Sequence, residues 1–277
     1  GVMAIPSALL FASLSTVPES PRWLVLKNMD QEAFDILTHI HGGRTASVEW
    51  EDIQRSVHQL KTGDLKDVFS KRVRPRLWMG MLLAVFSQTV GINAIMYYAP
   101  LIFQKTGAGI DSALMQTMLI GCINLLFTLV AIGLIDRFGR RPLLIAGTIG
   151  MAVALTVMSV SFLTNATTGY LLLVSMLLYI ASFAVSMGPV VWVIIAEVFP
   201  THLRSLAMGV CTITIWVACL IVTLAFPVML NRLGGGIAFL VFDGVCLALF
   251  IFLMFRVPET KGRTLEELEQ ELYKADR

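Results

Sequence analysis

Four side chains, carried by three apolar segments, are of the types that bind an uncharged ligand rich in hydroxyl groups. They are Gln88, Asn93, Asn124 and Trp216. An amide both donates and accepts hydrogen bonds, and a tryptophan ring offers a flat apolar face. Together they suit a neutral polyhydroxylated molecule, whose hydroxyls need amides and whose C–H face stacks on an aromatic ring. A charged ligand would require ionic partners, and this set contains none.

The segments that carry these residues are apolar enough to cross a bilayer. Of the 277 residues, 56% are hydrophobic and only 14% are charged, against about 25% charged in an average soluble domain. Runs of about 20 apolar residues span a bilayer as helices. We therefore predict an all-α, polytopic membrane protein. Its predicted spans cover residues 76–103, 113–135, 143–163, 170–195, 205–230 and 237–255.

Helix geometry places the four residues in one layer of the membrane. At 1.5 Å per residue, Gln88 lies roughly 18 Å from the inner end of its span. Asn93 lies slightly farther out, and Asn124 and Trp216 each lie about 16 Å from one end of their spans. Alternatively, each amide only holds helices together by an interhelical hydrogen bond. The common depth favours a binding layer.

The same span contains residues that weaken a helix. Gly91 and Pro100 are expected to loosen it between the binding layer and the outer surface, and irregular backbone at that depth is tolerated where it lines a cavity. Tyr97 and Tyr98 would then close over a bound ligand, unless they belong to an interfacial aromatic belt. Gly188 and Pro189 form a second weak point, towards the inner side.

The basic residues predict which face is cytoplasmic. Of the 21 lysines and arginines, only Lys105 and Arg232 fall on the other face. By the positive-inside rule, residues 18–75 and 256–277 are cytoplasmic, in a protein of the cell membrane. The net charge of +2 reflects this topology and gives no reason to expect a nucleic-acid partner.

The inner loops and flanking segments carry charges of both signs. We predict salt bridges that hold the inner end of the bundle in one conformation and break in the other, a cytoplasmic latch. Simple positive-inside anchoring explains the arginines but not the acidic residues. The predicted latch residues are Glu19, Arg22, Asp136, Arg137, Arg140, Arg141, Glu197 and Arg204.

The remaining polar regions flank the spans. In residues 18–75, Trp50, Ile53, Val57 and Leu60 recur at helical spacing. This stripe indicates either helices that pack under the bundle, which we favour, or a linker on the membrane surface. After residue 256, Thr264 and Glu267 form a capping box that begins a short tail helix.

Other chemistry has little support in the sequence. The spans contain no histidine, and the chain has no metal-ligand spacing and no nucleophile elbow, so we expect no enzyme, metal or cofactor. The four cysteines, all within predicted spans, are expected to be small core residues. Asp243 lies about six residues into the last predicted span. It is either a proton site or a solvated or paired carboxylate near the outer mouth.

Six motifs occur in order along the chain. They are PESPRWL (18–24), QTVGINAIMYYAP (88–100), DRFGRRP (136–142), GPVVW (188–192), EVFPTHLR (197–204) and PETKGRTLEE (258–267). In these motifs the chain resembles the sugar porter branch of the major facilitator superfamily, over essentially its whole length. The resemblance implies a parent of twelve transmembrane helices, in two six-helix bundles, that moves sugar by alternating access.

The resemblance also implies a domain organisation. Residues 1–17 would end the sixth transmembrane helix, and residues 18–75 would form an intracellular helical domain. Residues 76–255 would be helices seven to twelve, and residues 256–277 a cytoplasmic tail helix. The expected partners are the bilayer, the missing N-terminal six-helix bundle and a small sugar or polyol. In the family, a proton-coupling acid lies in the missing half.

The family's sugar-contacting positions match here at Gln88, Asn93, Asn124, Trp192 and Trp216. Ser87 replaces a glutamine, and Ile215 and Cys219 stand where amides are common. These departures favour the broad expectation of a monosaccharide or polyol over plain glucose. The alternatives are a transporter-like sugar sensor, which the short tail disfavours, and a carrier of another small metabolite.

Overall fold

A computed structural model describes residues 4–42, 46–51, 53–54, 64–105, 109–164, 170–200 and 203–262. Every regular element in these ranges is a helix. The chain divides into two compact units, Gly1–Gly63 and Asp64–Arg277, each with its own hydrophobic core.

The described residues of the first unit form the helices α1, α2 and α3 and one further helical stretch. Helix α1 (Ala4–Leu14) is apolar and exposed, α2 (Pro21–Leu26) begins with a proline, and α3 (Asp30–His41) begins with acidic residues. Proline and acidic side chains both favour a helix N-terminus. In the helical stretch after Gly42, Trp50 packs edge-on against Phe34 and Ile53 is buried. The predicted apolar stripe thus contributes to this unit's own core, while Val57 and Leu60 lie outside the described residues.

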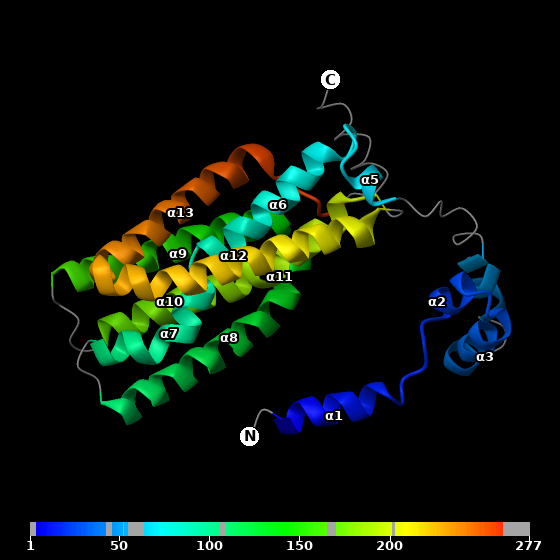
Figure 1. The fold of residues 1–277 in the computed structure, drawn as a ribbon, viewed down its shortest axis with the longest axis horizontal. Helices are drawn as coiled ribbons and strands as arrows, with labels where there is room; N and C mark the ends of the chain where they lie inside the picture. The colour runs from blue at the N-terminus through cyan, green and yellow to red at the C-terminus, as the bar shows by residue number, and fades with distance from the viewer. Residues whose placement is uncertain are drawn as a thin grey trace. The chain divides into compact units, whose positions relative to one another are not determined.

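Within the described part of the second unit, six segments are long and apolar enough to cross a membrane. Together they confirm the predicted all-α architecture with six spans (Figure 1). A short helix, α5 (Leu65–Val68), precedes them. The spans are α6 (Arg74–Thr89) with α7 (Ile92–Lys105), α8 (Ile110–Phe138), α9 (Arg140–Leu163), α10 (Leu171–Val185) with α11 (Met187–Val198), α12 (Arg204–Arg232) and α13 (Gly234–Arg256). The predicted tail helix lies in residues 263–277, outside the described ranges.

Two of the six spans are broken near their middles. Between α6 and α7 the chain turns at Gly91, whose φ of +98° is in the region that favours glycine. Between α10 and α11 the break falls at Ser186, one residue before Met187 and three before Pro189. Both breaks lie next to the weak points that the sequence predicts.

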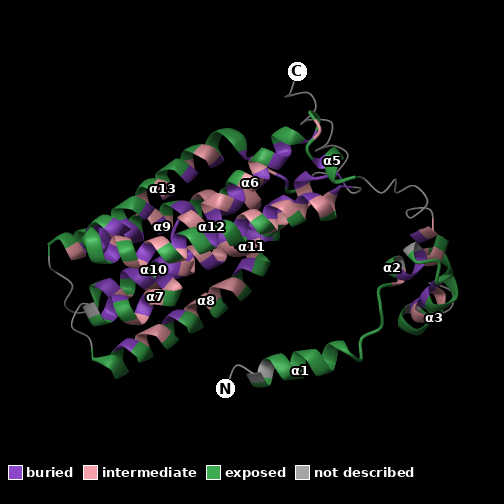
Figure 2. Cartoon of the chain, in the orientation of Figure 1, coloured by how far each residue is buried: buried purple, intermediate pink, exposed green. Residues whose placement is uncertain are grey.

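Helix α9 packs closely against its two neighbours, α10 and α13. A Cβ added at Gly147 would collide with Ser186, and one added at Gly150 would collide with Ser182, so the missing side chains permit this approach. By contrast, α8 and one side of α12 remain largely exposed (Figure 2). Of the four cysteines, Cys122 on α8 is exposed, which corrects the prediction that all four lie in the core.

Candidate functional site

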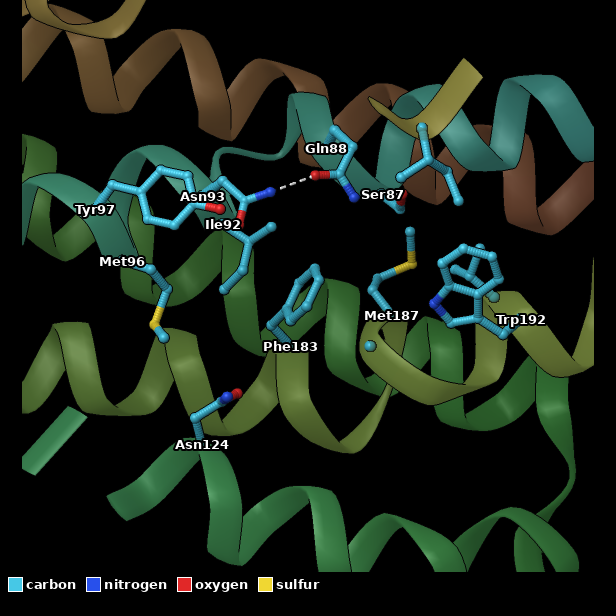
Figure 3. A pocket seen from close by; sticks show the side chains of 13 residues that line it. Ser87, Gln88, Ile92, Asn93, Met96, Tyr97, Asn124, Phe183, Met187 and Trp192 are labelled. Atoms are coloured by element: carbon cyan, nitrogen blue, oxygen red, sulfur yellow. Dashed lines mark hydrogen bonds between the residues drawn. The ribbon is translucent and has the colours of Figure 1, made fainter. Parts of the chain in front are cut away.

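A cavity of about 300 Å³ is enclosed by the two broken spans together with α8 and α12 (Figure 3). None of the described residues that line it is charged. The lining consists of Ser87, Gln88, Ile92, Asn93, Met96, Tyr97, Asn124, Phe183, Met187, Gly188, Val191, Trp192 and Ile215.

The polar wall of the cavity straddles the break between α6 and α7. Asn93 Nδ2 donates to Gln88 Oε1 at 2.6 Å and to Cys219 Sγ at 3.1 Å. Gln88 Nε2 donates to Ser87 Oγ at 3.1 Å, and Ser87 Oγ in turn donates to the carbonyl of Ala84 at 2.7 Å. The two amides are therefore mutually oriented before any ligand arrives.

Asn124 reaches the cavity from α8, on the side opposite the Gln88–Asn93 pair (Figure 3). Phe183 lies between these polar groups, and Trp192, 41% exposed, lines the end of the cavity towards α11. The arrangement offers amides on two sides and aromatic faces between them. It can hold an uncharged molecule that has hydroxyl groups at its edge and C–H groups on its faces.

Trp216 does not line this cavity. Its neighbour Ile215 faces the cavity, and consecutive residues of a helix are turned by about 100°. Trp216 is consequently 62% exposed on another side of α12. Counting residues along a span predicts the depth of a side chain but not the direction in which it points.

Five apolar lining residues were not predicted from the sequence. They are Ile92, Met96, Phe183, Met187 and Val191. Apolar residues in an apolar span carry no distinguishing signal. Spacing gives a clue for two of them, since Met96 and Val191 each lie three residues after a predicted site residue of the same helix, Asn93 and Gly188.

The predicted gating residues divide between two surroundings. Tyr97 lines the cavity and is 58% exposed, and Gly188 lines it at the start of α11. Tyr98 instead packs into the bundle, where its ring lies 5.6 Å from that of Phe226 and its hydroxyl donates to the carbonyl of Thr223. Pro189 is not among the lining residues.

At the end of the bundle that the sequence predicts to be cytoplasmic, the start of α9 is tied to α11. Arg140 pairs with Glu197 at 2.9 Å and more loosely with Asp136 at 3.5 Å. The Asp136 side chain is 82% exposed, whereas those of Arg140 and Glu197 are 15% and 27% exposed. The pair with Glu197 is therefore the better shielded of the two, and screening by water and salt weakens exposed pairs most.

A second tie involves Glu259, in the segment that follows α13. Its two carboxylate oxygens accept the backbone N–H groups of Arg140 and Arg141, each at 3.0 Å, at the first turn of α9. Partial burial alone would raise the pKa of Glu259. Hydrogen bonds from the backbone of Lys261, Arg140, Arg141 and Thr260 outweigh that effect and hold the pKa below its ordinary value. Its motif is recognisable in the sequence, but its partner on α9 is not.

The other predicted latch residues have different contacts. Arg141 donates to the carbonyls of Leu253 and Met254 near the end of α13, and the Arg137 guanidinium lies over the ring of Phe138. Within the described residues, Arg204 has two buried nitrogens without a hydrogen-bond partner and makes no ion pair with Glu197. Glu19 is an exposed residue of the first unit, and the side chain of Arg22 lies outside the described part.

Asp243 lies deeper than predicted. Because α13 begins at Gly234, Asp243 is its tenth residue of 23, near the middle of the span rather than near its mouth. Its Oδ2 accepts the Thr156 hydroxyl at 2.8 Å. Both residues line a groove of about 580 Å³ between α9 and α13.

The chain is similar to curated sugar carriers. It is 41% identical over 274 residues to the D-xylose-proton symporter of Escherichia coli, and the match covers 96% of this chain and 55% of the relative. It is 38% identical to the arabinose-proton symporter of Bacillus subtilis (96% and 57% covered). It is 37% identical to the glucose facilitated diffusion protein of Zymomonas mobilis (98% and 57% covered). The chain thus spans a little over half the length of these relatives.

The fold and the family model agree with these matches. The structure of the major facilitator superfamily proton:xylose symporter bound to 6-bromo-6-deoxy-D-glucose matches with a TM-score of 0.79 at 38% identity. That match covers 98% of this chain and 58% of the other. The model of the family "Sugar (and other) transporter" matches residues 1–272. The chain therefore belongs to this transporter family of the major facilitator superfamily.

Proposed function

We propose that the chain forms the carboxyl-terminal, substrate-binding part of a carrier for a neutral monosaccharide or polyol. The observation that carries the proposal is the convergence of three amides, from both sides of a broken span and from α8, on one uncharged cavity with an aromatic wall. Relatives named for xylose, arabinose and glucose support the same class of substrate.

The hydrogen bonds already formed define what the ligand must supply. An amide nitrogen has two hydrogens, and both of those on Asn93 Nδ2 are engaged, whereas Gln88 Nε2 uses one, on Ser87. A donor remains on Gln88, an acceptor remains on Asn93, and Asn124 offers both. A ligand hydroxyl both donates and accepts, so adjacent hydroxyls of a sugar match this set.

The carrier as a whole would work by alternating access between two bundles, with this chain supplying one of them. Tyr97 on α7 would cover the ligand from one side of the membrane, and the cytoplasmic latch would close the other end. Some matched relatives are named proton symporters and one is named a facilitated diffusion protein. The cavity walls contain no carboxylate among the residues that the structure describes, so a coupling proton would bind elsewhere.

Binding to the chain in lipid nanodiscs tests the ligand class directly. Ligand-observed NMR would compare D-xylose, L-arabinose, D-glucose and xylitol with the anion D-gluconate. We expect signal from one or more of the neutral compounds and none from the anion, because an uncharged cavity does not repay the desolvation of a carboxylate. Preference for the anion would exclude this proposal.

Transport requires the complete carrier. Joining this chain to the amino-terminal bundle of the Escherichia coli D-xylose symporter and measuring uptake of labelled sugars into liposomes would test it. An imposed pH gradient would separate symport, which the gradient accelerates, from facilitated diffusion, which it does not.

A further inference from the structure

The break between α6 and α7 is necessary for the site. In an uninterrupted helix, residues five positions apart are turned by about 140° from each other, so Gln88 and Asn93 would point to different sides. Here the chain turns at Gly91, and the two amides are bonded at 2.6 Å. The geometry of the break therefore decides whether the polar wall exists.

The break leaves a backbone carbonyl in need of a partner. In a continuous helix the carbonyl of Val90 would accept the N–H of Ala94, four residues later. In this chain it accepts the hydroxyl of Tyr179, which comes from α10, at 2.9 Å. Both Val90 and Tyr179 are completely buried, so water is not available to replace that hydrogen bond.

Packing supports the same bend from another helix. The ring of Phe242 on α13 lies so close to Gly91 that an added Cβ would approach it to 2.7 Å. Phe242 in turn stacks on Phe226 of α12, with ring centroids 5.8 Å apart. The bend is thus enclosed by neighbours on α10 and α13, and Tyr179 on α10 donates to the buried Val90 carbonyl.

We propose that Tyr179 is a positioning residue for the binding site: by holding the Val90 carbonyl, its hydroxyl stabilises the bend that brings Gln88 and Asn93 together. In the bent span the carbonyl accepts the Tyr179 hydroxyl, whereas in a straight span it would accept the Ala94 N–H. Loss of the hydroxyl therefore raises the free energy of the bent span and not that of the straight one. The effect on sugar binding rests on the proposed function, but the effect on the bend does not.

The test replaces the hydroxyl without changing the ring. Nitroxide labels at the exposed positions Leu82 on α6 and Gln104 on α7, in a Cys122→Ser background in nanodiscs, report the length of the broken span by pulsed electron resonance. We expect one distance in the unmodified chain and an additional, longer one in Tyr179→Phe. An unpaired buried carbonyl shifts such an equilibrium by about five- to 150-fold, and binding of D-xylose should weaken accordingly.

Two further variants separate this role from general stability. Gly91→Ala penalises the bend independently, through its positive φ and through Phe242, and should also populate the longer distance. Ser159→Ala is the matched control. It removes a buried hydroxyl that donates at 2.7 Å to the carbonyl of Gly236, away from the cavity. It should lower the melting temperature while leaving the distance and the xylose affinity unchanged.

The outcomes are distinct. If Tyr179→Phe keeps the original single distance and only melts earlier, as Ser159→Ala should, Tyr179 is a packing residue and the proposal is wrong. If the longer distance appears but D-xylose, L-arabinose and D-glucose bind to neither form, the bend is held as proposed and the sugar site is refuted instead.

Discussion

At the scale of single residues, the amide pair Gln88–Asn93 has two roles that are separable in principle. The two amides share a hydrogen bond, and each keeps some of its hydrogen-bonding capacity for a ligand. Cys219 does not line the cavity, but its sulfur accepts from Asn93 and so orients that amide from behind. Selectivity between ligands would then depend on a residue that no ligand touches.

Replacing Gln88 by alanine should weaken sugar binding. Loss of one partner from a buried hydrogen bond costs about 1–3 kcal/mol, which corresponds to roughly five- to 150-fold in affinity. Calorimetry or NMR titration with D-xylose gives the affinity, and a detergent melting curve gives the stability.

Gln116→Ala is the control, because this half-buried amide on α8 donates to Ser112 of its own helix and is not among the residues that line the cavity. Gln116→Ala should change neither the xylose affinity nor the melting temperature appreciably. An unchanged xylose affinity in Gln88→Ala, together with a lowered melting temperature, would show that Gln88 serves the scaffold rather than the site.

At the scale of elements, carboxylates secure the inner end of the bundle by two different means. Glu197 pairs with the side chain of Arg140, and Glu259 accepts the backbone of α9 at its first turn. The positive end of the α9 dipole adds to the second interaction. Both ties converge on the start of α9, which connects α8, α11 and the segment after α13.

Glu259→Gln should reduce stability at neutral pH but not in acid. Its folded pKa lies below the ordinary value of 4.5. Its hydrogen bonds therefore contribute fully above about pH 4.5 and are lost as the pH falls through the folded value. We expect a deficit of about 1 kcal/mol at pH 7, because the group is only partly buried. Below pH 4 the two melting temperatures should approach each other.

Asp111→Asn provides the comparison, since Asp111 is an exposed carboxylate in the first turn of α8. At pH 7, Asp111→Asn should reduce stability less than Glu259→Gln does. A Glu259→Gln deficit that persists undiminished in acid would mean that the carboxylate charge is not what stabilises the start of α9.

Arg140→Ala should lower the free energy of unfolding more than Asp136→Asn does. The first change leaves the partly buried Glu197 without its partner, while the second removes an exposed contact at 3.5 Å. Exposed pairs are worth about 0–1 kcal/mol. In a complete carrier, Arg140→Ala should also raise the inward-facing population, seen as cysteine labelling from the cytoplasmic side. Equal labelling in both variants and the parent would favour simple topological anchoring.

At the scale of the whole molecule, the second unit forms one helical bundle that holds the cavity. The exposed faces of α8 and α12 flank that cavity, and the chain covers a little over half of each relative that it matches. In the proposed mechanism, both bundles are needed to seal the ligand alternately from each side.

Liposomes that contain only this 277-residue chain should therefore show no sugar-specific uptake above that of empty liposomes. The joined carrier described above should restore it. The measurement compares the uptake of labelled D-xylose with that of labelled L-glucose, which serves as the leak control. Specific uptake by the chain alone would refute the two-bundle mechanism.

The sequence alone determined the properties that depend on local composition. Apolar runs define six spans because each must bury its own backbone in lipid, and the 1.5 Å rise sets the depth of Gln88, Asn93 and Asn124. Gly91 and the Gly188–Pro189 pair likewise indicated the two breaks, since they act on the backbone where they stand, whereas Pro100 lies inside α7 without interrupting it.

Only the tertiary structure decided the directions in which side chains point and the partners that they meet. Trp216 and Tyr98 lie on the predicted spans, but the rotation of their helices turns them away from the cavity. The partners of Glu259 and Tyr179 are 118 and 89 positions away in the chain. Such contacts depend on how packed helices are rotated and spaced against one another, which no local pattern in the sequence specifies.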